Sequence, residues 1–218
     1  MPETYAQKID GMFWAGGTTL KVNLAFERLP TFTCLPHDRG QFGPTIHLLP
    51  QGDDPLGAIR ESYEVTKRGE LALEPTIEWY FHTPIDPSLK DRRGHHNGAL
   101  FVQWVPHTLA NGKRWEDVES SYVKHLLSIC DRFAPDTSSC VIDTFVLSPA
   151  GIERHFGITG GHIQHVDNGF AFDQRAPYDI PVDGMFACSA GCHPAGSVVG
   201  AAGHNAANIV LKAMGKKD

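Results

Sequence analysis

Apolar side chains recur along this chain with two different periods, and each period predicts one type of element. In residues 18–27 every second side chain is apolar, with Leu20, Val22, Leu24 and Phe26 on one face, as in a half-buried strand. Alternating or short continuous apolar runs predict further strands at residues 45–49, 75–82, 99–105, 139–147 and 185–188. The chain is therefore expected to build a sheet.

Helical spacing is clearest in residues 115–133, where apolar side chains three and four positions apart form one stripe. Asp54-Pro55 and Ser148-Pro149 each place an N-cap residue before a proline suited to the first helical turn. They predict helices over residues 54–68 and 150–156. A last helix, rich in glycine and alanine, is predicted to end near Met214.

The order of these elements favours an α+β fold with a mixed, mainly antiparallel sheet and packed helices. Residues 1–17 are expected to be a lead-in segment. Residues 18–182 then form the main sheet-containing region, and residues 183–218 a closing strand, loop and helix. That closing strand has no evident partner upstream in the sequence.

Composition narrows the possible functions. The chain has 218 residues, of which 41% are hydrophobic and 20% charged, and this is typical of a globular domain with a sizeable core. A net charge of -6, without a cluster of Lys and Arg, argues against nucleic acid as a partner. No apolar run is long enough to span a membrane, and the amino terminus lacks a signal-peptide pattern. A cytoplasmic location is expected.

Histidine and cysteine suggest two further kinds of chemistry, and the sequence supports neither strongly. The 12 histidines and 5 cysteines include Cys188, Cys192 and His193, but no second cluster at zinc-ligand spacing accompanies them, so no metal site is expected. A thiol nucleophile activated by His193 would need hydrogen-bond geometry that neighbours in sequence rarely reach. A metal- or cysteine-dependent hydrolase therefore stays a minor alternative.

The closing loop offers a different kind of site. Gly191, Gly196, Gly200 and Gly203 leave the backbone unshielded, so a flat or anionic ligand could approach the amides at the start of the last helix. The same glycines would also suit a tight connection between strand and helix that binds nothing.

A specific motif occupies this loop. Residues 184–207 read Gly-Met-Phe-Ala-Cys-Ser-Ala-Gly-Cys-His-Pro-Ala-Gly-Ser-Val-Val-Gly-Ala-Ala-Gly-His-Asn-Ala-Ala. This stretch resembles the carboxy-terminal FAD-binding signature of phytoene desaturase-like flavoproteins, within which the chain is most similar to the pyridine nucleotide-disulfide oxidoreductase domain-containing protein 2 group. Weaker similarities, such as residues 21–30, 105–115 and 148–157, extend the resemblance over nearly the whole chain, but only to the carboxy-terminal half of the family.

The resemblance implies an architecture like that of amine oxidases. Residues 18–182 would be mostly substrate domain, and residues 183–218 would supply the last strand and helix of the FAD domain. The residues implied to lie against FAD are Ser189, Ala190 and Gly191, near the pyrophosphate and ribityl chain, and Gly196, Ser197 and Val198, near the flavin ring at the start of the helix. The residues implied to face the substrate are Gly160, Gly161 and His162. The resemblance identifies no catalytic acid or base.

The chain departs from the family pattern in ways that bear on activity. Ser189, Ala195 and Ser197 stand where the family has glycine, so each adds a Cβ near the cofactor. The amino-terminal nucleotide-binding half has no counterpart in this sequence. We therefore expect the carboxy-terminal part of an FAD-dependent oxidoreductase that is inactive alone, completed by a companion chain and acting on an apolar small molecule. The alternative is a non-catalytic binding or oligomerisation module, and either role makes a homo-oligomer plausible.

Overall fold

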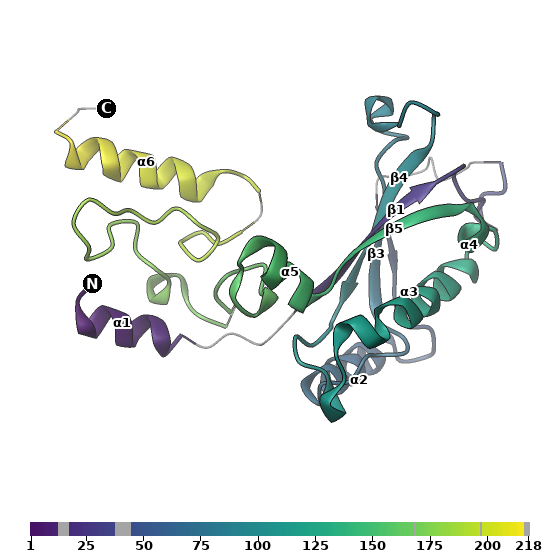
Figure 1. Cartoon of the computed structure of the whole chain (residues 1–218), viewed down its shortest axis with the longest axis horizontal. Coiled ribbons are helices and arrows are strands. Elements are labelled where there is room, and N and C mark those ends of the chain that lie inside the picture. Colours follow the sequence, from purple (N-terminus) through teal and green to yellow (C-terminus); the bar gives the residue numbers. More distant parts are fainter. Residues whose placement is uncertain (13–17, 38–44, 168, 197, 216–218) are drawn as a thin grey trace. The chain divides into compact units, whose positions relative to one another are not determined.

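The computed structural model describes residues 1–12, 18–37, 45–167, 169–196 and 198–215 (Figure 1). The chain divides into two compact units, one comprising Gly16–Gly157 and the other comprising Met1–Ala15 together with Ile158–Asp218. Residues 158–182 thus belong with the closing segment, whereas the sequence placed them in the sheet-containing region. The amino-terminal segment also belongs to the smaller unit.

The larger unit is built on a five-stranded sheet with the order β2-β3-β4-β1-β5. Its strands are β1 (Thr19–Phe26), β2 (Thr45–Leu48), β3 (Thr76–Phe81), β4 (His96–Gln103) and β5 (Val141–Leu147). Every pairing in this sheet is antiparallel, which confirms the α+β class. Strand β4 begins three residues before the predicted start, because His96 and Asn97 already pair with β1 although their polar side chains interrupt the apolar run.

The core lies between one face of this sheet and helix α3 (Trp115–Asp131), which carries the predicted apolar stripe (Figure 1). Leu20, Trp79 and Leu126 are completely buried there. The two polar groups on the α3 stripe are satisfied by backbone carbonyls. The indole of Trp115 donates to the oxygen of His107 at 3.0 Å, and the hydroxyl of Tyr122 donates to that of Ala72 at 3.0 Å.

The two predicted helix caps are present. Asp54 accepts a hydrogen bond from the Gly57 amide at 2.9 Å and begins α2 (Pro55–Lys67). Ser148 accepts one from Gly151 at 3.1 Å and begins α5 (Pro149–Phe156). These bonds satisfy amides that the first helical turn leaves unpaired. The remaining short helices of this unit are η1 (Pro87–Leu89), η2 (Ala110–Gly112) and α4 (Thr137–Cys140).

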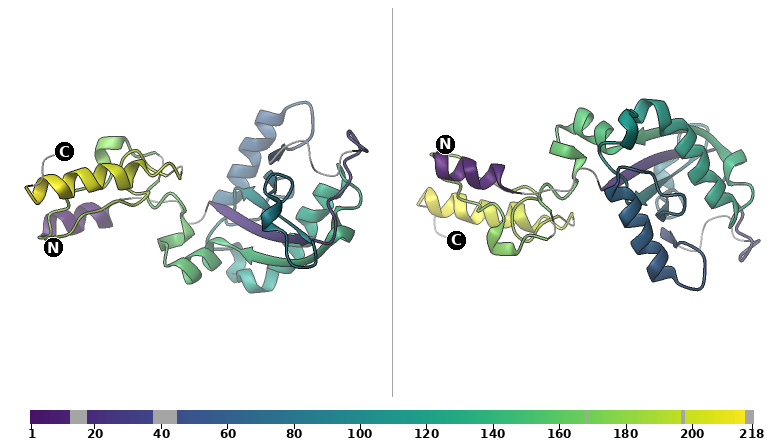
Figure 2. Two further views of the ribbon diagram at one scale, coloured as in Figure 1. Left: turned by 90° about the horizontal axis from the view of Figure 1, so that it is seen from above. Right: turned by 90° about the horizontal axis from the view of Figure 1, so that it is seen from below.

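The smaller unit contains two longer helices, α1 (Glu3–Asp10) and α6 (Ala201–Ala213), and two single turns, η3 (Thr159–Gly161) and η4 (Phe172–Gln174). Figure 1 shows α6 and α1 on either side of the irregular segment that follows residue 158, and the two helices overlie one another in Figure 2. The sequence analysis assigned no helix to the lead-in segment. The predicted helix near the carboxyl end is confirmed.

The predicted closing strand is wrong. Around residues 185–188 the described chain has only an isolated antiparallel bridge between Phe186 and Asp179. A strand exists only where a second strand pairs with it, and no neighbour lies beside this segment in the part of the chain that the structure describes. Met185 is instead 55% exposed.

None of the described helices is both long enough and apolar enough to cross a lipid bilayer.

Candidate functional site

The closing loop begins with a tight turn at Ser189. The Ser189 hydroxyl accepts a hydrogen bond from the Gly191 amide at 3.1 Å, and its carbonyl accepts one from the Cys192 amide at 3.0 Å. A third bond joins the Ala195 amide to the Cys192 carbonyl at 2.7 Å. The serine that replaces a family glycine therefore occupies the Gly191 N–H, a group that a phosphate would otherwise be able to accept.

Left-handed backbone conformations recur in the second part of this loop. Ala195 has φ 78°, Val198 φ 58° and Gly200 φ 72°. The conformation suits glycine and is unfavourable for residues with a Cβ, most of all for a β-branched one. The expectation that Ala195 would be forced into a disliked φ is thus confirmed, whereas Ser197 lies outside the described residues. Ser189 shows no such strain.

The structure brings the loop predicted to face the substrate next to the loop predicted to hold the cofactor. A Cβ added at Gly196 would lie 2.9 Å from the Gln164 side-chain oxygen, and one added at Gly191 would lie 3.4 Å from Val166. Only glycine fits these two positions without displacing the segment that follows Gly160, Gly161 and His162. The two predicted groups of residues are therefore neighbours in one unit.

His162 is the only titratable residue among the predicted site residues. Its side chain is 3% exposed, and its Nδ1 atom has no hydrogen-bond partner in the described part of the chain. Burial lowers the pKa of the imidazole, so the neutral form prevails at pH 7. Gly160 and Gly161, both left-handed at φ 64° and 61°, fold the preceding turn.

Tyr178 organises the loop, although the sequence analysis did not single it out. Its hydroxyl donates to the His193 carbonyl and accepts from the Asn205 side chain on α6 at 2.9 Å. Helix α6 is thereby tied to the Cys192–Ala195 turn. A lone tyrosine in an irregular segment carries no periodic signal, and only the fold reveals its partners.

Helix α6 begins at Ala201, not at Gly196 as the resemblance implied, so Val198 lies before the helix. Its N-cap residue, Gly200, has no side chain that could accept from the first-turn amides. Val198 is fully exposed and Val199 is 70% exposed. The helix start thus combines unsatisfied N–H groups with an uncovered apolar approach.

The cysteines and histidines do not assemble a second type of site. Within the described residues, no three His, Cys, Asp or Glu side chains are grouped so that they could hold a metal ion. Cys192 is buried, and burial raises the pKa of its thiol, which disfavours the thiolate that a nucleophile needs. The His193 ring instead packs edge-on against Phe172, with centroids 4.9 Å apart.

Comparison with known proteins gives a consistent relationship. No protein-family profile matches the chain. The chain is 33% identical over 227 residues to pyridine nucleotide-disulfide oxidoreductase domain-containing protein 2 of Rattus norvegicus, and 32% identical to the protein of the same name from Mus musculus. It is homologous to a part of these proteins. The alignments cover 97% of this chain and 38% of each relative, so the chain spans well under half of their length.

A more distant similarity links the chain to an uncharacterised protein of Mycobacterium bovis. The identity is 26% over 229 residues, covering 93% of this chain and 41% of that protein. The coverage is again nearly complete on one side and partial on the other. The relationship therefore supports an origin in part of an oxidoreductase-related protein and indicates a flavin or nucleotide cofactor for the whole.

Proposed function

We propose that this chain is the carboxy-terminal part of an FAD-dependent oxidoreductase of the phytoene desaturase-like type. The observation that carries the proposal is the segment of residues 189–203. There a tight turn, a strained loop and a helix without a side-chain cap follow one another, next to the loop of Gly160 and Gly161. The partial coverage of the relatives supports the same conclusion.

The residues fit FAD at one end of the site and less well at the other. The free amides at the start of α6 suit an anionic or electron-rich edge of the cofactor, and Val198 and Val199 suit the flat ring. At the Ser189 turn the Gly191 amide is already bonded to the serine hydroxyl, so that turn offers fewer donors to a pyrophosphate. When bound, FAD would supply the chemistry by accepting a hydride from the substrate.

Activity requires the rest of the protein. The chain contains no strand followed by the Gly-x-Gly-x-x-Gly pattern that binds the pyrophosphate of a dinucleotide. A companion polypeptide would supply this half and cover the apolar approach at Val198 and Val199. The substrate expected from the resemblance is an apolar small molecule.

Co-expression tests the proposal. The chain purified alone should carry no stoichiometric flavin, whereas the chain purified with a polypeptide that supplies the nucleotide-binding half should show a flavin absorption spectrum. Val198→Asp should reduce the flavin content of that complex, and Leu73→Asp, at an exposed position in the larger unit, should leave it unchanged. A stable complex without flavin would refute the assignment.

A second candidate function is a binding or oligomerisation module, and edge strand β5 favours it. Ile142 and Phe145 on this strand are 50% and 55% exposed, and uncovered edges of this kind attract a further strand. Light scattering during size-exclusion chromatography would detect a dimer. Ile142→Lys should dissociate it, and a monomer at all concentrations would argue against this role.

A further inference from the structure

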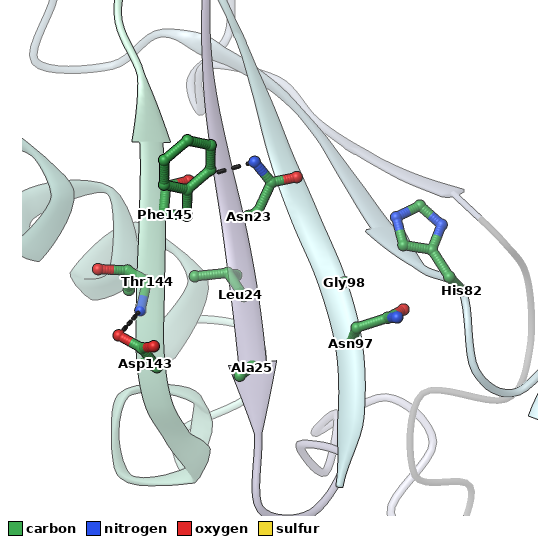
Figure 3. A pocket seen from close by; sticks show the side chains of 9 residues that line it. All are labelled: Asn23, Leu24, Ala25, His82, Asn97, Gly98, Asp143, Thr144 and Phe145. Carbon is green, nitrogen blue, oxygen red and sulfur yellow. Dashed lines mark hydrogen bonds between the residues drawn. The ribbon is translucent and has the colours of Figure 1, made fainter. Parts of the chain in front are cut away.

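The face of the sheet opposite the α3 core carries a pocket of ≈ 300 Å³ at the end where β1 finishes and β5 begins (Figure 3). Asn23 and Ala25 of β1 form its floor together with Asn97 of β4. Asp143 and Phe145 of β5 border it. The volume is at the lower end of the range for small-molecule sites, so the ligand would be small.

The sheet register explains why this place is hollow. Ala25 lies opposite Asn97 on one side and opposite Asp143 on the other. In the next row Asn23 lies opposite Phe145. The methyl group of Ala25 is therefore surrounded by longer side chains on neighbouring strands, and the space above it stays open.

Most polar groups that remain available in the pocket are acceptors. The Asn97 side-chain amide donates to the Leu89 carbonyl at 3.1 Å, while its buried oxygen has no partner in the described structure. The Asn23 amide donates to the Phe145 carbonyl at 3.2 Å. Asp143 accepts from the adjacent Thr144 amide at 2.8 Å and forms no ion pair with any described residue. Donors are thus largely used within the protein, and acceptors are left for a ligand.

The charges near the pocket are compatible with a cation. Asp143 is the only carboxylate in its lining, and His82 is the only other titratable group there. Burial, followed by the nearby Lys21, lowers the pKa of His82, so this imidazole is neutral at pH 7. The hydroxyl of Tyr80, whose ring stacks on His82, donates to Glu78. Lys21 lies four residues before Ala25 on β1, roughly 13 Å along the strand.

We propose that this pocket binds a small organic cation bearing N–H donors, such as an alkylammonium ion. The carboxylate of Asp143 balances its charge, the oxygen of Asn97 accepts from its N–H groups, and the ring of Phe145 provides an aromatic surface for its positive end. This ligand class differs from the apolar substrate expected from the resemblance. The site uses no residue predicted to hold FAD, and its occupation does not depend on the proposed oxidoreductase function.

Nuclear magnetic resonance titration of the full chain with butylammonium chloride tests the proposal, with sodium chloride at equal ionic strength as the reference. The amide signals of Asn97, Asp143 and Thr144 should shift saturably, with millimolar affinity. Asp143→Asn keeps the side-chain shape and should weaken binding about fivefold, the upper limit for an exposed ion pair. Asp53→Asn, a matched change at an exposed loop position, should leave the affinity unchanged.

Each other outcome overturns the proposal. Absence of saturable shifts would show that the pocket takes no alkylammonium ion. An affinity that Asp143→Asn does not alter would place the cation elsewhere. Glucose binding as tightly as butylammonium would show that the acceptors recognise neutral hydroxyl groups. Tetramethylammonium has the charge but no N–H donor, so binding as tight as that of butylammonium would remove the role assigned to Asn97.

Discussion

Gly98→Ala offers a sharp test of the sheet because the structure leaves no room for even one methyl group. Gly98 lies in β4 between β1 and β3, opposite Leu24 and Phe81. A Cβ at this position would lie 2.3 Å from the Tyr80 carbonyl oxygen and 3.1 Å from a ring carbon of Phe26. Ordinary contacts are about 3.5 Å, so β3 and β4 would have to separate by about 1 Å.

The expected cost follows from two opposing terms. Overpacking a well-filled core costs about 1–3 kcal/mol. Replacing glycine by alanine regains about 0.5–1 kcal/mol of backbone entropy. The variant should therefore be destabilised by about 1–2 kcal/mol, measured as a lower urea midpoint in unfolding followed by the fluorescence of the buried Trp79. An unchanged or higher midpoint would refute the packing described for this strand pair.

The same substitution at Gly203 provides a matched control. Gly203 lies inside α6, and a Cβ there meets nothing within 4 Å. Alanine should stabilise the helix by about 0.5–1 kcal/mol, because glycine is a poor helix former. Destabilisation by both variants would mean that the chain does not tolerate alanine for reasons other than local space.

Three further predictions concern thiols, pH and backbone strain. In the native chain Cys34 and Cys188 should react with a thiol reagent before the three buried cysteines, and equal rates for all five would contradict the fold. Burial lowers the pKa of His82 and His162, so the unfolded chain binds more protons below about pH 6.5, and the urea midpoint should fall as the pH drops through that value. His162→Gln should flatten this dependence, and a midpoint that rises on acidification would refute it. Ala195→Gly should raise the thermal midpoint of the smaller unit by relieving up to about 1 kcal/mol of left-handed strain, and a lower midpoint would count against φ 78°.

Local periodicity predicted elements whose pattern coincides with their burial. The alternation in β1 and the stripe of α3 are both confirmed because each buries one continuous face. The pocket on the second face was not predicted. Its residues, among them Asn97 and Asp143, lie on different strands, and their proximity depends on a register that no local pattern encodes.

The closing segment failed as a prediction for a different reason. Its apolar run is a genuine strand signal, but a strand needs a neighbour, and the described chain provides only the bridge at Phe186. The relatives extend far beyond the region they share with this chain. A polypeptide supplying the neighbouring strand would therefore complete the element that the sequence predicts.

Hydrogen exchange can detect this completion. The Ala187 amide already donates to the Tyr178 carbonyl at 2.8 Å, so its protection should change little. The amides of Phe186 and Cys188 donate no backbone bond in the described structure and should exchange quickly in the isolated chain. In a flavin-containing complex at least one of them should become protected. Equal exchange at both amides with and without the companion would show that the run at residues 185–188 is not a strand in the complete protein.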